Sequence, residues 1–462
     1  MDDENSENEQ FKDQGYTRPT VLVLLPTRGT CHRFMHLLIK LTGDSVPEEY
    51  LDRFNREFGP PPPEEELRDE ALKRHRRKVL EEKGAAWQEL FGDNVNDDDD
   101  FKLGMALYAK KSDGAKAEKR NGSKKKDRFA SAHAINVKLY TDFYSSDIIV
   151  ASPLGLKMAI SSDANDGEAD FLSSVEICLI DRTDVLMMQN WDHVNDVLEN
   201  INQLPKSNNE TDFARVRNYF LVDQAANWRQ LIMLSDILDP LMLSTFKRYA
   251  KSHSGILKSR RRIPEDDGSI SKVIVPTRQV FQRIPTQTFT TMSDDRLKYF
   301  TQNILPQIRH SGQKHTMIFI PSYFDFVLVR NHLLRTEADF VSITEYSRVS
   351  ETSRGRARFL QGRKPLMLYT GRAHFFLRHK IKGIRNLIFF GLPEHPDFYA
   401  DLVNVINEGL EDSYADSNTE ASSTSCIALF TKYEVHALER IVGNKQSTRM
   451  AKGEKSTFIF VS

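Results

Sequence analysis

The chain has 462 residues, of which 39% are hydrophobic, and this is enough apolar material for two cores of ordinary size with tails besides. Its 64 Lys and Arg residues nearly equal its 65 Asp and Glu residues, so a formal net charge of -1 excludes attraction to nucleic acid through overall charge and leaves only local patches. Three widely separated cysteines, Cys31, Cys178 and Cys426, argue against a disulfide framework or a zinc site and favour a reducing compartment.

The start of the chain carries no apolar targeting region, and no stretch approaches the ~18 uninterrupted apolar residues of a membrane span. We therefore expect a soluble intracellular protein that makes no membrane contact. Residues 1–17 are predicted to form a disordered acidic tail.

The first half alternates apolar runs of strand length with helical patterns, which predicts a first α/β domain over residues 18–257. The predicted strands are Thr20–Leu25, Val137–Tyr140, Asp147–Ala151, Val175–Asp181 and Gln230–Leu234. The predicted helices are Thr30–Leu41, Pro153–Ser161 and Trp191–Ile201.

Residues 59–132 interrupt this alternation and are interpreted as a low-complexity charged insertion. It begins with a proline run at 60–63, continues through a helix candidate at 64–83, and contains four aspartates at 97–100. Residues 101–128 then hold ten Lys and Arg residues against three acidic ones, a net charge of +7. Three interpretations stay open: a solvated loop, a tether to RNA or an acidic partner, and a nuclear-import signal.

The second half repeats the α/β alternation after a polar, Arg-rich linker at 258–285, and this predicts a second domain over 286–462. Its predicted strands are Thr316–Ile320, Phe340–Thr344, Leu366–Thr370, Asn386–Gly391 and Ile427–Thr431. Its predicted helices are Asp294–Arg309, Tyr323–Leu334, Ser350–Gln361, Asp397–Glu408 and Tyr433–Val442. The sequence thus predicts the α/β class, with two doubly wound domains in tandem.

Polar and small residues follow these strands, at the sheet edge where doubly wound folds bind ligands. In chain order the segments are Pro26-Thr27-Arg28-Gly29, Ser152-Pro153-Leu154-Gly155, Asp181-Arg182-Thr183-Asp184, Ser235-Asp236, Pro321-Ser322, Tyr369-Thr370-Gly371-Arg372 and Leu392-Pro393-Glu394. Seven such segments in this order resemble the tandem RecA-like core of the DEAD-box RNA helicases, which belong to helicase superfamily two.

Six residues of these segments are candidates for RNA binding. Small and hydroxyl residues let a backbone approach a sugar-phosphate chain, and an Arg supplies a charged fork. The candidates are Thr27, Arg28, Ser152, Gly155, Thr370 and Arg372. The alternative interpretation is that the Pro and Gly residues of these segments only end strands and start helices, with Thr27 and Ser152 as caps.

The nucleotide site that such a core would hold is degenerate. No G-x-x-x-x-G-K-S/T occurs, and only about twenty residues precede the first strand, so we expect the first strand and phosphate loop of a RecA-like domain to be absent from this chain. Asp181, Asp184 and Ser235 are relics of the site, whereas Arg182 replaces the acid that orients the attacking water. Between Arg385 and Arg440 no Arg occurs to serve as a finger. We therefore expect no enzyme activity, metal, cofactor or small-molecule substrate.

Longer phrases resemble a narrower family. They are Phe143-Tyr144-Ser145-Ser146-Asp147-Ile148, Ala151-Ser152-Pro153-Leu154-Gly155-Leu156, Met188-Gln189-Asn190-Trp191-Asp192-His193 and Arg372-Ala373-His374-Phe375. They are similar to the digestive-organ-expansion-factor family, also called U3 small nucleolar RNA-associated protein 25. The resemblance implies a nuclear and nucleolar protein of the small-subunit processome. It also implies binding to U3 small nucleolar RNA, precursor ribosomal RNA and other processome proteins in 18S RNA maturation, without helicase activity.

Two departures from that family's pattern stand out. The family has a long acidic N-terminal region and a further segment before the first strand, so either the chain is truncated or its first domain is incomplete. Gly371 stands where an acidic residue is expected beside Arg372. Two other functions remain as alternatives: an active but unconventional RNA-dependent ATPase or helicase, and a module that binds only proteins.

Three further features have both a structural and a functional interpretation. Trp191 is expected to anchor a helix against the sheet, with stacking on a base as the weaker alternative. His374 is expected either over RNA or in a buried cluster at a helix start. Arg354, Arg356, Arg358 and Arg363 give one helix a basic face, which is either simply solvated or in contact with an RNA backbone.

Overall fold

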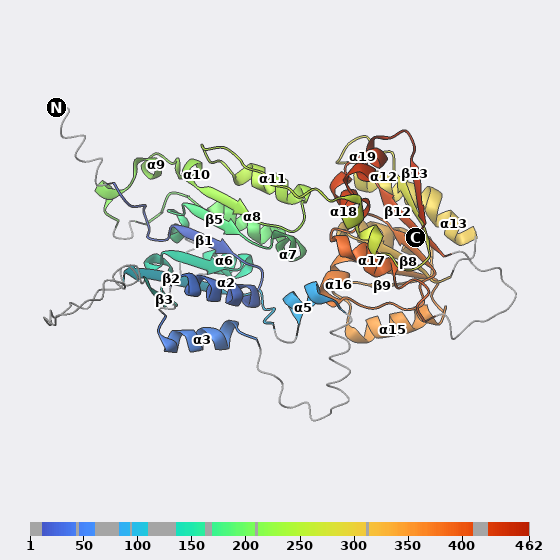
Figure 1. Ribbon diagram of the computed structural model, residues 1–462, viewed down its shortest axis with the longest axis horizontal. Coiled ribbons are helices and arrows are strands. Elements are labelled where there is room, and N and C mark those ends of the chain that lie inside the picture. Colours follow the sequence, from blue (N-terminus) through green and yellow to red (C-terminus); the bar gives the residue numbers. More distant parts are fainter. Residues whose placement is uncertain are drawn as a thin grey trace, which may run out of the picture. The chain divides into compact units, whose positions relative to one another are not determined.

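The computed structural model describes the chain over residues 12–42, 46–60, 83–92, 95–109, 135–161, 169–207, 211–310, 314–409 and 424–461. Two compact units make up the chain, Met1–Lys258 and Ser259–Ser462, and each is described by itself (Figure 1). Most of the predicted acidic tail and basic stretch, and nearly all of the predicted helix at 64–83, lie outside the described residues.

The first unit is built on a mostly parallel sheet. Among the described residues it has six strands in the order β3-β2-β4-β1-β5-β6; β4, β1, β5 and β6 are parallel, and β2 is antiparallel to both its neighbours. The strands are β1 (Val21–Leu24), β2 (Lys102–Ala109), β3 (Ile135–Leu139), β4 (Ile148–Ala151), β5 (Ile177–Ile180) and β6 (Gln230–Met233). The helices are α2 (Arg28–Leu41), α3 (Glu48–Phe58), α5 (Ala85–Phe91), α6 (Pro153–Ile160), α7 (Thr183–Met188), α8 (Trp191–Asn200), α9 (Asn218–Leu221), α10 (Ala225–Trp228) and α11 (Pro240–Tyr249).

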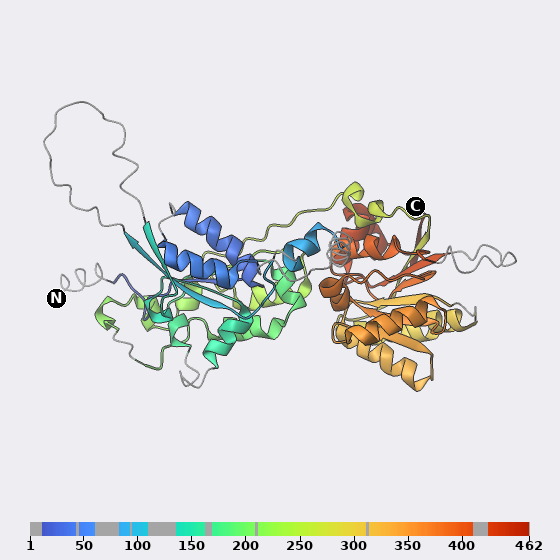
Figure 2. The same ribbon diagram turned by 90° about the horizontal axis from the view of Figure 1, so that it is seen from below.

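Alternating side chains of the central strand β1 supply two separate cores. Val23 packs with side chains of α2 and α3, whereas Leu22 and Leu24 pack with those of α6 and α8. Successive residues of a strand point to opposite faces of the sheet, so an uninterrupted apolar run fits a strand that is covered on both sides. Figure 2 shows the blue helices α2 and α3 on one side of this sheet and the green helices on the other.

The second unit repeats the plan with seven strands among its described residues, in the order β13-β7-β12-β11-β8-β10-β9. All neighbours are parallel except β13 and β7. The strands are β7 (Arg278–Arg283), β8 (Thr316–Ile320), β9 (Phe340–Ile343), β10 (Leu366–Thr370), β11 (Asn386–Phe389), β12 (Ser425–Phe430) and β13 (Thr457–Val461). The helical segments are α12 (Met292–Tyr299), a π-helical stretch (Phe300–Ile304), α13 (Leu305–His310), α14 (Tyr323–Arg335), α15 (Val349–Leu360), α16 (Gly371–Leu377), α17 (Pro396–Val403), α18 (Val435–Val442) and α19 (Asn444–Lys452).

This architecture confirms the predicted α/β class with two tandem doubly wound sheets. Three strands, β2, β7 and β13, lie where the sequence predicted none. Strand β2 lies inside the predicted insertion at 59–132, where the low-complexity residues on both sides hid its apolar alternation. Strand β7 lies inside the predicted linker at 258–285. It was not predicted as a strand because its sequence, RQVFQR, is polar. Its Gln279 is buried and accepts a hydrogen bond from the Tyr399 hydroxyl at 2.7 Å, so the polar side chain is satisfied inside the sheet.

Strand β13 extends the second sheet at one edge, where the sequence analysis had found no element. Within the described part of the chain, no helix combines the length and apolar character needed to cross a membrane.

Candidate nucleic-acid interface and relic nucleotide site

Three of the six RNA-binding candidates cap helices that begin at the carboxyl ends of parallel strands. The Thr27 hydroxyl accepts from the Thr30 N–H of α2, the Ser152 hydroxyl from the Gly155 N–H of α6, and the Thr370 hydroxyl from the Ala373 N–H of α16, at 3.3, 2.9 and 3.2 Å. Each hydroxyl satisfies one of the N–H groups that the first turn of a helix leaves without a partner. The capping interpretation is therefore confirmed for Thr27 and Ser152, and Thr370 caps α16 in the same way although no cap was predicted there.

An acidic segment of the first unit, Asn96–Phe101, covers the start of α2, and we call it the acidic strap. The Arg28 N–H donates to the Asp98 carbonyl at 2.8 Å, and the Gly29 N–H donates to the Asn96 carbonyl at 2.7 Å. These two N–H groups belong to the first turn of α2, where an external anion would otherwise find free donors. The strap therefore occupies the backbone donors at this helix start.

The Arg28 side chain also contacts the strap. Its Nη2 donates to the Asp100 carbonyl at 2.7 Å, and its Nε lies 3.1 Å from the Asp98 carboxylate. The guanidinium stands over the Phe58 ring, 5.7 Å from its centroid. The Arg28 guanidinium was predicted to contact an RNA phosphate. In the structure it contacts carbonyl and carboxylate oxygens of the protein itself.

The end of the strap closes over α6 in the same way. The Ser152 N–H donates to the Phe101 carbonyl at 3.0 Å, and the Phe101 N–H donates back to the Ser152 hydroxyl at 3.3 Å. A Cβ placed on Gly155 would lie only 2.3 Å from the Phe101 carbonyl oxygen, so this position has no room for a side chain. The structure brings Thr27, Arg28, Ser152 and Gly155 together around one segment that sequence reasoning had not connected with them.

Arg182 lies at the centre of the relic nucleotide site. It follows β5 with φ +50°, and its guanidinium nitrogens lie 3.5 Å from Asp184, 3.9 Å from Asp236 and 3.8 Å from Glu89. Burial raises the pKa of the Asp184 carboxyl, and the nearby Arg182 charge opposes that rise. The other relics bond locally: the Asp181 carboxylate accepts the Arg182 N–H at 2.8 Å, and the Ser235 hydroxyl donates to the Ile237 carbonyl at 2.7 Å.

These residues do not fit a magnesium nucleotide. Mg²⁺ needs near-octahedral coordination by carboxylate and phosphate oxygens. Here the carboxylates of Asp184 and Asp236 share one guanidinium, which already carries the positive charge. Glu89 and Asp236 were not among the predicted site residues, and the only sequence signal that could have pointed to them is that an Arg in a partly buried loop attracts acidic partners.

In the second unit, Thr370 and Arg372 meet at a carboxylate that the sequence analysis did not select. The Thr370 hydroxyl donates to Glu345 at 3.0 Å, and the Arg372 Nε lies 3.4 Å from the same carboxylate. The Glu345 side chain is 7% exposed, whereas that of Arg372 is 32% exposed. Glu345, from the loop after β9, thus places an acidic group beside Arg372 although position 371 is glycine. Gly371 itself packs against the backbone of Pro321.

His374 lies inside the second unit rather than on its surface. Its Nδ1 is 3.2 Å from the Tyr369 hydroxyl, its Nε2 is 3.8 Å from Asp401, and its ring meets Phe398 edge-on at 4.6 Å. The buried-cluster interpretation is confirmed, and the alternative position over RNA is wrong. Trp191 is likewise buried, and its indole N–H donates to the Thr245 hydroxyl at 3.1 Å, which confirms its role as an anchor.

Acid is expected to destabilise the second unit through His374. Burial lowers the pKa of this imidazole below its ordinary value of about 6.5, so the unfolded chain takes up the proton more readily than the folded one. The histidine's contribution to stability is therefore complete above about pH 6.5 and decreases as the pH falls from there toward the folded-state pKa. Urea unfolding at pH 7.5 and 5.5 should show a smaller acid loss in His374→Gln than in the parent. Equal losses in the two proteins would contradict this assignment.

The basic face predicted for α15 is present only in part, because Arg354 and Arg358 lie one turn apart on it, whereas Arg356 lies on the other side of the helix. Arg354, Arg358 and Arg363 are exposed, and Arg356 donates to the Lys380 carbonyl at 2.6 Å. Either interpretation given above, a solvated face or an RNA contact, is compatible with this exposure.

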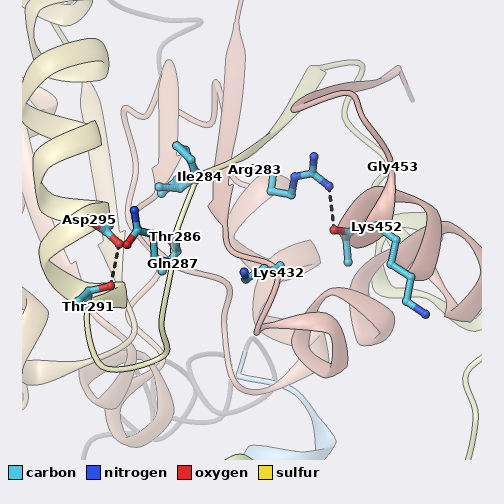
Figure 3. A pocket seen from close by; sticks show the side chains of 11 residues that line it. Arg283, Ile284, Thr286, Gln287, Thr291, Asp295, Lys432, Lys452 and Gly453 are labelled. Carbon is cyan, nitrogen blue, oxygen red and sulfur yellow. Dashed lines mark hydrogen bonds between the residues drawn. The ribbon is translucent and has the colours of Figure 1, made fainter.

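A cavity of about 670 Å³ opens at the carboxyl ends of β7 and β12 in the second unit (Figure 3). Its wall includes Arg283, which donates to the Ala451 carbonyl at 2.7 Å, and Thr291, which donates to Asp295 at 3.0 Å. Lys432 and Lys452 also line it, and both side chains are exposed. None of the predicted RNA-binding or nucleotide-site residues lines this cavity.

Two doubly wound α/β units, each with capped helices and polar loops at the carboxyl ends of its parallel strands, define a class: tandem doubly wound α/β proteins with an NTP hydrolase-like domain. The family described as "UTP25, NTP hydrolase-like domain" matches residues 1–116 and 122–257, and "Utp25, C-terminal domain" matches residues 269–460. The chain therefore belongs to the UTP25 family, which confirms the resemblance inferred from the sequence.

Relatives in plants, fungi and animals match almost the whole chain. It is 38% identical to "Protein NUCLEOLAR FACTOR 1" of Arabidopsis thaliana over 97% of this chain and 55% of the relative. It is 35% identical to "U3 small nucleolar RNA-associated protein 25" of Pyricularia oryzae over 98% and 57%, and to the Homo sapiens homolog over 99% and 55%. The chain thus spans about half the length of these relatives.

Solved structures with a similar arrangement include Saccharomyces cerevisiae Dbp5 bound to RNA and ADP BeF3, at 10% identity and a TM-score of 0.28 over 67% of this chain and 64% of that one. A DEAD box protein of Methanococcus jannaschii matches at 12% identity and the same TM-score, over 96% and 79%. Similarity at this level adds nothing to the fold described above.

Proposed function

We propose that this chain is a catalytically inactive, DEAD-box-like scaffold of the nucleolar small-subunit processome. In this proposal it binds the U3 ribonucleoprotein and precursor ribosomal RNA during 18S RNA maturation and acts in the nucleolus. Relatives named U3 small nucleolar RNA-associated protein 25 and NUCLEOLAR FACTOR 1 support the assignment. Because the chain spans about half of each relative, the activity of the whole protein is part of the proposal.

The pairing of Arg182 with Asp184 and Asp236 is the observation that carries the proposed inactivity. Phosphoryl transfer relies on metal-held phosphates, a residue that positions the water, and charge stabilisation in the transition state. The Arg182 guanidinium already pairs with the carboxylates of the site. It therefore neither holds a metal ion with its phosphates nor positions the attacking water. We infer that the fold is retained for binding rather than for turnover.

RNA binding in this proposal depends mainly on the second unit. The candidates in the first unit face the acidic strap, whereas in the second unit Arg354, Arg358 and Arg363 are exposed and about a third of the Arg372 side chain reaches solvent. Contacts to phosphates are electrostatic and release counterions, so they make affinity fall as salt rises.

A module that binds only proteins is the second candidate function, and the strap favours it for the first unit. Both helix starts there are already covered by the chain's own oxygens. In this case the exposed arginines would contact acidic proteins rather than RNA.

One pair of measurements tests these proposals. Purified protein should release no γ-phosphate from ATP above the level of an Asp181→Ala control, with or without RNA. Its affinity for a precursor ribosomal RNA fragment should fall linearly on a log-log plot against salt, with a slope of about -0.7 per phosphate contacted on a single strand. RNA-stimulated hydrolysis that disappears in Asp181→Ala would refute inactivity. Absence of RNA binding at low salt would leave the protein-only function.

A further inference from the structure

Exposed aromatic rings gather at the carboxyl ends of β8 and β9 in the second unit, and we call Tyr323, Phe324 and Tyr346 the aromatic ledge. Phe324 is 83% exposed, Tyr346 is 68% exposed and Tyr323 is 38% exposed. Tyr323 and Tyr346 meet edge-to-face with their ring centroids 5.6 Å apart. Single exposed rings are common on soluble proteins, but a group of exposed apolar side chains on neighbouring loops marks a site where another molecule binds.

The sheet order explains why residues distant in sequence meet here. Strand β10 lies between β8 and β9, so the three loops that follow these strands are neighbours at one edge of the sheet. Tyr323 and Phe324 begin α14 after β8, Tyr346 follows β9, and Arg372 follows β10. Glu345, the neighbour of Tyr346, contacts Arg372 and so joins the ledge to the candidate site of the second unit.

Positive charge lies beside these rings. Arg348, two residues beyond Tyr346, is exposed and forms no salt bridge with any residue in the described ranges. Arg372 is paired with Glu345, yet about a third of its side chain reaches solvent. One exposed acid, Glu351, lies on the first turn of α15, where its carboxylate accepts from the Arg348 backbone N–H at 3.4 Å. Farther along the same helix, Arg354 and Arg358 extend the positive charge.

Open aromatic faces next to arginines fit one ligand class better than others. Unpaired bases stack on aromatic side chains while their phosphates contact cations, whereas the bases of a duplex are already stacked inside it. The carboxylates of an acidic protein could pair with the arginines. They could not stack on the exposed rings of Phe324 and Tyr346 as a planar base can.

We propose that the aromatic ledge is a stacking platform for unpaired bases of single-stranded RNA, with Arg348 and Arg372 holding the adjacent phosphates. This inference rests on the proposed RNA-binding function and deepens it, because it assigns the RNA form and the contact residues. The rings supply affinity that is independent of salt, and the arginines supply the part that salt weakens.

The test compares single-stranded and duplex RNA of the same length with the full chain. The Phe324→Ala/Tyr346→Ala double variant should bind single-stranded RNA at least about ten-fold more weakly, since each stacked base contributes 1–3 kcal/mol. Its affinity for duplex RNA should stay unchanged. Tyr346→Phe should bind like the parent, because the ring is retained. The matched control is Phe289→Ala, which removes another exposed ring of this unit and should change neither affinity.

Three results would overturn the inference. If the parent binds RNA but the double variant keeps its single-strand affinity, the ledge assignment fails while the proposed function stands. If the double variant loses duplex binding equally, the rings do not act by stacking on unpaired bases. If the parent binds no RNA, the proposed function fails and the ledge inference with it. Unchanged thermal unfolding of the variants, expected for exposed side chains, excludes loss of fold as the cause.

Discussion

Replacing Arg296 with methionine is expected to lower the unfolding free energy of the second unit by about 3–5 kcal/mol, the usual cost of leaving buried charges without their partner. The Arg296 side chain is 4% exposed, and its two terminal nitrogens lie 3.4 Å from Asp325 and 2.6 Å from Glu434. Methionine keeps most of the volume but removes the cation that both carboxylates share, while Glu434 keeps its hydrogen bonds from Thr431. Urea unfolding followed by circular dichroism measures the loss, and hydrogen exchange in α12 and α14 locates it.

A surface ion pair of the same unit provides the control. Lys272 and Asp397 lie 2.6 Å apart but are both about half exposed, so Lys272→Met should cost less than about 1 kcal/mol. The pH dependence of the unfolding free energy should also differ between the two variants. Burial already raises the pKa of Asp325, and Arg296 opposes this rise, so the Arg296→Met variant should regain stability as the pH falls toward the range where Asp325 is protonated. A loss below about 1 kcal/mol in Arg296→Met would show that these charges are solvated.

Adding a single methyl group at Gly155 is expected to destabilise the first unit by about 1–3 kcal/mol, the usual range for overpacking a filled site. The new Cβ would lie 2.3 Å from the Phe101 carbonyl oxygen and 2.9 Å from the Phe101 nitrogen. Because these are backbone atoms, relief requires the strap to move away from the start of α6. All three tryptophans of the chain lie in the first unit, at positions 87, 191 and 228, so tryptophan fluorescence during urea unfolding reports on this unit.

Gly355, a glycine near the middle of α15, gives the opposite expectation. A Cβ at this position would have only one neighbour, 3.8 Å away, so Gly355→Ala should be neutral or stabilise by up to about 1 kcal/mol through helix propensity. Hydrogen exchange at the Arg28 and Gly29 amides distinguishes strap release from general destabilisation. Faster exchange there in Gly155→Ala, with unchanged exchange in α8, is the expected pattern. If Gly155→Ala were as stable as Gly355→Ala, the strap could not be packed against α6.

The fold could be predicted because its strands are short apolar runs that end in small or polar residues. Val21–Leu24 and Leu366–Thr370 are covered on both faces, and such strands leave a continuous hydrophobic signal in the sequence. Strand β7 has no continuous apolar run, because it contains the buried Gln279. The side-chain oxygen of Gln279 accepts a hydrogen bond from Tyr399, which is 120 residues away in the sequence. A buried polar residue that depends on a distant partner cannot be recognised from its own neighbours.

For the candidate site, the sequence predicted where some residues lie in the fold but not which residues they contact. Thr27 and Ser152 were correctly placed at helix starts, because hydroxyl residues after a strand are good caps, whereas the cap formed by Thr370 was not predicted. The partners of the charged residues were not predictable. Arg28 is 72 residues from Asp100, and Arg372 is paired with Glu345 across two strands of the sheet. Ion pairs between distant segments depend on the tertiary fold and leave no local sequence pattern.

The acidic strap has a consequence for competition at the first unit. Its aspartates are joined by the chain to the helix starts that they cover, so they act as a ligand whose effective concentration is fixed by a tether and does not fall on dilution. A free phosphate chain would have to displace this tethered ligand, and tethers of short length commonly hold their ends at millimolar levels. Polyanions that bind weakly would therefore not displace the strap from these helix starts. Selectivity among anions at this surface would depend on the covalent attachment of the strap rather than on the shape of the site.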